Sequence, residues 1–288
     1  MSVELANAYW TSAGPVEVHT GREWSLFSFA DRCAQASAAG FVGLGLWHAD
    51  IEHQLESTTL AEMRSHLDDN GLRLMELEFL WDWMVDEGEE ARTAADRLRR
   101  MLFETAEALD AHHIKAGNIP GVECDMPKLN ERYAELCADA ARHTSAKVLY
   151  EFMPFDVNVN SIDSALAVIE GIDRTGVVID TWHMSKLGIA PDDLRRIPVH
   201  YLGWIELSDG KYEWSEDRLD EVINRRNLPG DGEFDIRGYV DACRDHGYPG
   251  PWGVEVLSEE LRNNPIDVIF KRAYDSTAAF VGGVKGGV

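Results

Sequence analysis

Three observations predict that this chain folds as a single (β/α)8 barrel. Short apolar runs alternate with longer amphipathic segments from one end to the other, and together they make eight strand-then-helix units. Strands that are separated by helices pair in parallel, and eight such units close into a barrel. No linker and no shift in composition divides the 288 residues, so we expect one barrel domain over residues 1–281 and a flexible Gly-rich tail over 282–288.

The predicted strands are short and apolar, as expected for strands that are buried on both faces of a parallel sheet. They cover residues 5–10, 41–47, 72–80, 112–116, 147–152, 176–181, 201–207 and 252–257. Helical patterns cover residues 25–39, 58–70, 89–109, 126–142, 161–171, 235–246 and 265–280, with a short helix or turn over 192–197. An open doubly wound sheet is the alternative, but no Gly-x-Gly-x-x-Gly pattern follows the first strand, as that fold would need to bind a dinucleotide.

The composition excludes several classes of partner. The chain has 27 Lys and Arg against 51 Asp and Glu, a formal charge of −24, which repels phosphate backbones and anionic lipids and suits a bound cation. The four cysteines lie far apart, as is typical of reduced thiols rather than of a zinc knuckle or a disulfide framework. No signal peptide or apolar run of about 18 residues is evident. We therefore expect a soluble, cytoplasmic protein that binds neither nucleic acid nor membranes.

Four acidic residues interrupt strands that should be apolar. Each lies near the carboxyl end of one of the last four predicted strands: Glu151, Asp180, Glu206 and Glu255. Side-chain alternation gives all four the same facing, so they converge at the mouth of the barrel if that direction is inward. Four ionised acids this close together require a counter-charge, and oxygen ligands favour Mn²⁺ or Mg²⁺ over Zn²⁺. The alternative is that each acid pairs with a Lys or Arg or caps a helix.

Further residues near the strand ends are candidates for binding a substrate. His183 follows Asp180 by three residues, and Lys115 is a cation inside a predicted strand, where it either binds substrate or neutralises Glu78. The candidate substrate-binding residues are His183, Lys115, Glu78, His48, Trp182 and Asp209.

Aromatic and basic residues at the same end suggest how a ligand is enclosed. As a set, Trp10, Trp81, Trp83 and Trp182 favour a wall for a sugar or a ring-shaped ligand. The loop that carries Arg225, Arg226 and Asp231 is a candidate lid, and the alternative for it is an exposed charged loop.

Several motifs resemble the xylose-isomerase-like TIM-barrel superfamily. They are Glu-x-x-Pro at residues 151–154, Asp-x-x-His at 180–183, Ile-Glu-Leu-Ser-Asp at 205–209, Pro-Gly-Asp-Gly-Glu-Phe-Asp at 229–235 and Gly-Val-Glu-Val at 253–256. The resemblance implies a metal quartet of Glu151, Asp180, Glu206 and Glu255, with His183 binding substrate. Glu206 departs from the His or Gln that is common in the family. Glu151 and Glu255 would act as base and conjugate acid, and crowding by like charge is expected to raise the pKa of such a base.

The resemblance implies a metal-dependent isomerase or epimerase of a small polyhydroxy carbonyl compound, either a ketose or a cyclic polyol, acting through a metal-stabilised enediolate. The expected cofactor is one divalent ion, Mn²⁺ or Mg²⁺, with Co²⁺ or Zn²⁺ as alternatives. A dehydratase or lyase acting on an inosose-like or dehydroshikimate-like ring is the second expectation. A non-catalytic barrel that serves as a binding or complex subunit is the third. Barrels of this kind often form homodimers, and the sequence leaves the oligomeric state open.

Overall fold

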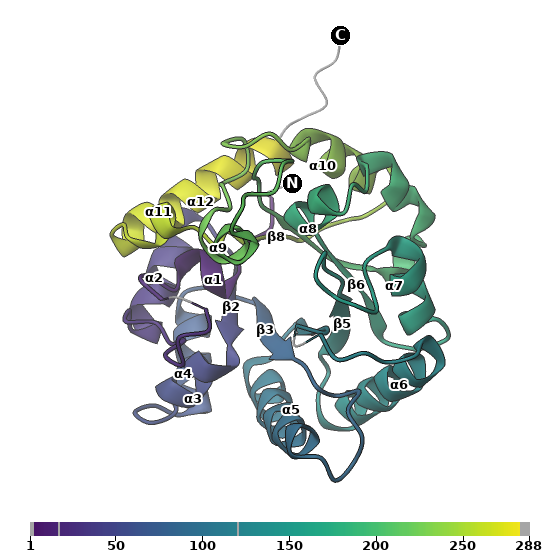
Figure 1. The fold of residues 1–288 in the computed structure, drawn as a ribbon. Coiled ribbons are helices and arrows are strands. Elements are labelled where there is room, and N and C mark those ends of the chain that lie inside the picture. Colours follow the sequence, from purple (N-terminus) through teal and green to yellow (C-terminus); the bar gives the residue numbers. More distant parts are fainter. Residues whose placement is uncertain (1–2, 17, 120, 283–288) are drawn as a thin grey trace.

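The structure, a computed structural model, describes residues 3–16, 18–119 and 121–282. Across these residues, eight strands form a closed barrel in which each strand pairs in parallel with the next and β8 pairs with β1 (Figure 1). The strands are β1 (Leu5–Asn7), β2 (Gly43–Trp47), β3 (Leu74–Leu80), β4 (His113–Ala116), β5 (Lys147–Glu151), β6 (Thr175–Asp180), β7 (Leu202–Leu207) and β8 (Trp252–Val254). The predicted (β/α)8 barrel is therefore confirmed.

Long helices surround the barrel as an outer ring (Figure 1). They are α2 (Phe29–Ala39), α4 (Leu60–Asp69), α5 (Glu90–Leu109), α6 (Met126–His143), α7 (Ile162–Ile169), α10 (Ile236–Asp245) and α12 (Ile266–Val281), with the 3-10 helices η1 (Pro191–Arg196) and η2 (Val199–Tyr201) before β7. Each of these seven α-helices overlaps a predicted one. Side chains on the outer face of the strands pack against these helices in one large apolar core.

Short helices that were not predicted follow the carboxyl ends of strands. They are α1 (Tyr9–Ser12), α3 (His48–Gln54), α8 (Thr181–Lys186), α9 (Arg218–Asn224) and α11 (Glu259–Arg262). Because α1 begins at Tyr9, β1 is shorter than the predicted strand over residues 5–10 and stops at Asn7. The Asn7 side chain accepts a hydrogen bond from Ser12 Oγ in this helix. These short helices shape the mouth of the barrel.

The interior of the barrel holds a small apolar cluster and several buried charged and polar side chains. Ala6, Leu149, Val178 and Trp204 form a small apolar cluster that is separate from the main core. Charged and polar residues that are almost fully buried also occupy the interior: His113 at the start of β4, Glu76 paired with it on β3, and Glu78, Lys115 and Glu206 nearer the mouth. Gly45 makes room for one of them, because a Cβ at this position would lie 2.6 Å from Glu76 Oε1. Barrel interiors are usually filled with branched apolar side chains, so this number of buried charged side chains is unusual.

Two expectations concern the ends and the thiols of the chain. Cys33, Cys124, Cys137 and Cys243 are all free, as predicted. No helix in the described ranges is both long enough and apolar enough to cross a membrane. Apart from Gly282, the predicted tail lies outside the described residues.

Candidate metal centre at the barrel mouth

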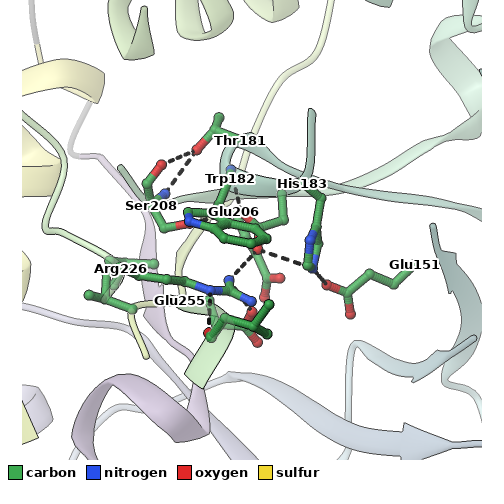
Figure 2. Close-up of polar contacts among 12 residues, drawn as sticks. Glu151, Thr181, Trp182, His183, Glu206, Ser208, Arg226 and Glu255 are labelled. Atoms are coloured by element: carbon green, nitrogen blue, oxygen red, sulfur yellow. Dashed lines mark hydrogen bonds and ion pairs between the residues drawn. The ribbon is translucent and has the colours of Figure 1, made fainter. Parts of the chain in front are cut away.

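Four buried side chains converge at the carboxyl ends of the strands. Glu151, Asp180, His183 and Glu255 each offer one ligand atom, and these atoms all lie within 4.8 Å of one another. His183 Nε2 lies 3.3 Å from Glu151 Oε1 and 3.6 Å from Asp180 Oδ2. Figure 2 shows Glu151 facing His183 on one side of the group. We call these four residues the mouth cluster.

The local structure of β6 and α8 orients Asp180 and His183. Asp180 is the last residue of β6 and the N-cap of α8, and its Oδ1 accepts hydrogen bonds from Trp182 N and Ser208 Oγ, both at 2.8 Å. One oxygen is thereby held by the chain, and the other is left for the mouth cluster. His183 follows three residues later, within the first turn of the helix, on the same side as its N-cap. The Asp-x-x-His spacing therefore places an imidazole beside a carboxylate.

Arg226 provides a buried positive charge beside the mouth cluster. Its Nη1 lies 2.6 Å from Asp180 Oδ2 and 3.0 Å from Glu255 Oε2, and its guanidinium carbon lies 4.8 Å from the Trp182 ring centroid (Figure 2). Backbone pairing fixes this residue, because Arg226 N donates to Leu257 O at 3.1 Å. Two carboxylates of the cluster thus already hold a cation.

Lys115 provides a second buried cation, just below the cluster. Its Nζ lies 2.6 Å from Glu206 Oε1, 3.0 Å from Glu255 Oε1 and 3.7 Å from Glu78 Oε1. Glu206 Oε1 also accepts a hydrogen bond from Trp204 Nε1 at 3.2 Å. Lys115 therefore connects Glu255, which follows β8, to Glu78 of β3 and Glu206 of β7.

Burial and charge shift the pKa values of these acids in opposite directions. Burial raises the pKa of Asp180, Glu78 and Glu206, although Arg226 opposes the effect at Asp180 and Lys115 opposes it at the two glutamates. Burial would also raise the pKa of Glu255, but Lys115 and Arg226 lower it to about 2. The expectation that crowding raises the pKa of the paired bases is therefore wrong for Glu255, because two cations contact its carboxylate.

The mouth cluster fits a divalent metal ion. Three carboxylates and one imidazole are a suitable donor set for Mn²⁺, Mg²⁺ or Zn²⁺. The guanidinium of Arg226 on Asp180 and Glu255 shows that this position attracts positive charge. The structure brings three of the four predicted ligands together, and within the described ranges His183 completes the group. Glu206, the remaining predicted ligand, lies against Lys115 instead.

A cavity of about 820 Å³ opens above the mouth cluster. Four of the predicted site residues line it: Glu78, Glu151, His183 and Glu255. Asp180, Lys115, Glu206 and Trp182 are buried behind this lining. Lys115 and Glu206 therefore lie beneath the cavity floor, whereas Trp182 packs behind the lining residues Arg226 and Trp214.

Two predicted substrate-binding residues lie away from the cavity lining. Asp209 accepts hydrogen bonds from the backbone amides of Gly210, Gly230 and Phe234, at 2.7, 2.9 and 3.0 Å, and so holds the loop after β7. His48 begins α3 and packs edge-on against Trp81, with ring centroids 4.8 Å apart. Burial lowers the pKa of His48 to about 4, so the ring is neutral at physiological pH.

The sequence did not reveal the position of Arg226. It was expected in a lid or an exposed charged loop, and it is 3 % exposed. Its neighbour Arg225 does lie at the surface, where it pairs with Asp220 at 2.7 Å. Nothing in the sequence distinguishes these two adjacent arginines, because the backbone pairing with the segment after β8 decides which one points inward.

The predicted aromatic wall is partly present. Of the four tryptophans expected to form it, Trp10 and Trp81 line the cavity, whereas Trp83 and Trp182 are buried away from it. Trp47 and Trp214 also line the cavity, although neither was included in the predicted set.

Comparisons with known proteins agree with this architecture. The chain is 23% identical to a 3-dehydroshikimate dehydratase of Pseudomonas aeruginosa over 232 residues, which span 80% of this chain but only 36% of that protein. It is 22% identical to an inosose isomerase of Halalkalibacterium halodurans over 244 residues, covering 80% of this chain and 83% of the relative. A crystal structure of the IOLI protein with a zinc atom superimposes with a TM-score of 0.80 at 16% identity, covering 97% of this chain and 98% of that one. Residues 33–274 match the model of the xylose isomerase-like TIM barrel family, and the chain belongs to that family.

Proposed function

We propose that this protein is a divalent-metal-dependent isomerase or epimerase of a polyhydroxy carbonyl compound, either a ketose or a cyclic polyol. The mouth cluster carries the proposal, because three carboxylates and an imidazole converge at the floor of a cavity large enough for such a substrate. The similarity to an inosose isomerase over 80% of the chain supports the isomerase class.

The residues of the cluster divide the chemistry between them. A divalent ion bound there supplies Lewis acidity toward a carbonyl oxygen and its neighbouring hydroxyl. Glu151 lines the cavity and carries no Lys or Arg partner among the described contacts, so we assign it the removal of the proton beside the carbonyl. His183, 3.3 Å away, orients that carboxylate. Glu255 is held ionised by Lys115 and Arg226, so its part in returning a proton requires that one of these cations moves away.

The donor set favours a hard metal. Carboxylate oxygens suit Mn²⁺ and Mg²⁺, and the single imidazole favours Mn²⁺ over Mg²⁺. We therefore propose Mn²⁺ as the resident ion, with Mg²⁺, Co²⁺ and Zn²⁺ as the ions to compare with it. Calorimetric titration of the metal-free protein with each ion measures the order of affinity.

Deuterium exchange tests the proposed reaction. Keto sugars and inososes are incubated with the Mn²⁺-loaded protein in deuterated water, and uptake beside the carbonyl is followed by NMR. Glu151→Gln should abolish the uptake while leaving the fold intact, and exposed Glu131→Gln is the matched control. Binding of less than about a tenth of an equivalent of any divalent ion, together with no exchange on any of these compounds, would exclude the proposal.

Dehydration is the second candidate reaction, and one observation favours it. The chain is 23% identical to a 3-dehydroshikimate dehydratase over 80% of its length. Dehydration begins with the same removal of a proton but ends with loss of a hydroxyl from the neighbouring carbon. Product analysis by mass spectrometry distinguishes the two, because isomerisation conserves the substrate mass and dehydration lowers it by one water.

A further inference from the structure

The cavity above the mouth cluster has a charged floor and an apolar wall. The floor consists of the ionisable side chains Glu78, Glu151, His183, Arg226 and Glu255. Most of the remaining lining residues are apolar, and the largest contributors are Trp10, Trp47, Phe79, Trp81, Met153 and Trp214. Charged or ionisable side chains recur in the described lining only with His19, Glu23 and Arg218, which come from the loop after α1 and from α9.

The wall is a continuous aromatic surface that is separate from the main core of the protein. Trp47 packs against Trp10 with ring centroids 4.9 Å apart and against Trp81 at 5.6 Å. Together with Phe79 of β3 and Met153, which follows β5, these rings belong to one apolar cluster at the barrel mouth. Of the acidic residues of the floor, Glu151 ends β5 and Glu255 follows β8, whereas Glu78 lies on β3 next to Phe79. The charged floor and the aromatic wall therefore adjoin within one cavity.

The outer part of the wall includes apolar side chains that face solvent. Leu219 is 57% exposed and Phe155 is 38% exposed, and both line the cavity. Val222 and Ile223 continue the apolar surface along α9, at spacings of three and four residues from Leu219. Single exposed leucines are common on protein surfaces, but a run of apolar residues that lines a cavity marks a binding surface.

The size and chemistry of the cavity indicate a substrate larger and less polar than a simple sugar. At about 30 Å³ per water-sized atom, the roughly twelve non-hydrogen atoms of a six-carbon sugar fill less than half of the volume. Hydroxyl groups placed against the aromatic wall would lose hydrogen bonds to water and find few partners there. An apolar ring placed in the same position would release water from both surfaces.

We propose that the polyhydroxy carbonyl compound acted on at this site also carries a flat apolar body such as an aromatic ring, joined to a compact oxygen-bearing head that includes the carbonyl and its neighbouring hydroxyl. The head reaches the charged floor, and the body lies against Trp10, Trp47 and Trp81 beneath α9. This inference rests on the proposed function for the head and on the aromatic wall for the body.

A matched pair of small ketones tests the proposal. Hydroxyacetone and 2-hydroxyacetophenone carry the same hydroxyketone head, but the second has a phenyl ring in place of a methyl group. Their dissociation constants are measured by calorimetry, with and without Mn²⁺. We expect 2-hydroxyacetophenone to bind at least about tenfold more tightly, because the ring buries additional apolar area.

Two pairs of variants locate the preference on the wall. Leu219→Ser and Leu26→Ser change leucines of nearly equal exposure, 57% and 59%, but only Leu219 lines the cavity. Trp81→Ala and Trp24→Ala are the second pair, since Trp24 stacks on His53 outside the cavity lining. The two wall variants should each reduce the preference for the phenyl ketone by about threefold or more, and the two controls should leave it unchanged.

The outcomes separate this inference from the proposed function. A preference below about tenfold, the absence of binding by both ketones, or a preference that survives both wall variants would overturn the proposed apolar body. Failure to bind metal or to exchange deuterium would instead remove the proposed function, and the ratio of the two dissociation constants could still be measured on the metal-free protein.

Discussion

Replacing Lys115 by methionine is the most informative test of how the barrel interior is held together. The ammonium of Lys115 lies 2.6 Å from Glu206, 3.0 Å from Glu255 and 3.7 Å from Glu78, and all four side chains are nearly inaccessible to solvent. Methionine fills a similar volume without the charge. The substitution therefore leaves three buried acids, of which only Glu255 keeps a second cation, Arg226.

The expected loss of stability follows from breaking a buried ion pair. Removing one partner of such a pair typically costs about 3–5 kcal/mol, because the other charge remains buried without compensation. For a chain of this size each kcal/mol lowers the melting temperature by about 2–4 °C, so we expect a decrease of about 6–20 °C. Glu206→Gln in the same protein removes one of the uncompensated charges and should restore part of this loss.

The loss should also grow as the pH rises. Burial already raises the pKa of Glu78 and Glu206 above the usual 4.5, and the charge of Lys115 opposes this effect. Without the ammonium both pKa values rise further, so the native state of the variant holds protons that the unfolded state releases. Stability contributed by such groups is present below the unfolded pKa and is lost as the pH rises through the native pKa. The difference between variant and parent should therefore be larger at about pH 8 than at about pH 5.

Thermal unfolding followed by circular dichroism measures the decrease in melting temperature, and urea unfolding at several pH values measures how the loss of stability depends on pH. Lys271→Met is the matched control, since Lys271 pairs with Asp275 at 2.7 Å on the surface of α12, where both side chains are mostly exposed. The control should melt like the parent protein. If Lys115→Met loses no more stability than this control, or if its loss does not grow with pH, Lys115 is not the counter-charge of the barrel interior.

Three further predictions concern separate parts of the molecule. Arg226→Met removes the cation that already occupies two carboxylates of the mouth cluster, so the dissociation constant for Mn²⁺ in calorimetry should fall by at least about tenfold, and weaker binding would contradict this. Asp50→Asn should destabilise the protein by about 3–5 kcal/mol in urea unfolding, because Asp50 is the buried partner of Arg32 at 2.5 Å; an unchanged midpoint would show that this pair adds nothing. Thr59→Ala should lose about 1 kcal/mol in the same assay, because the Thr59 side chain caps α4, and a loss near zero would mean that solvent replaces the cap.

The acids at the mouth were predictable because of the strands that carry them. A parallel strand covered on both faces should be apolar, so Glu151 and Asp180 at the ends of β5 and β6 stand out without any knowledge of the fold. Alternation then gives them a common facing, and closure of the barrel brings them together with Glu255. The position of His183 beside Asp180 was predictable for a similar local reason, because two residues that are three positions apart at the start of a helix lie on the same side of it.

The partners of these acids could not be predicted, because they depend on contacts between distant parts of the chain. Lys115 and Glu255 are 140 residues apart in the sequence and their side chains meet at 3.0 Å. Arg226 reaches Asp180 from 46 residues away, through a loop whose path is set by backbone pairing near the end of β8. Its neighbour Arg225 has the same chemistry and lies at the surface.

The sequence by itself determined the barrel, its order of strands and the end at which acidic side chains accumulate, because hydrophobic periodicity and strand alternation are local properties of the chain. The tertiary structure alone decided which cation neutralises which acid, that Glu206 lies against Lys115, and that aromatic rings near the ends of β1, β2 and β3 line the same cavity as the charged residues. These features depend on closure of the barrel and on the paths of its loops. Residues that are far apart in the sequence become neighbours only when the barrel closes.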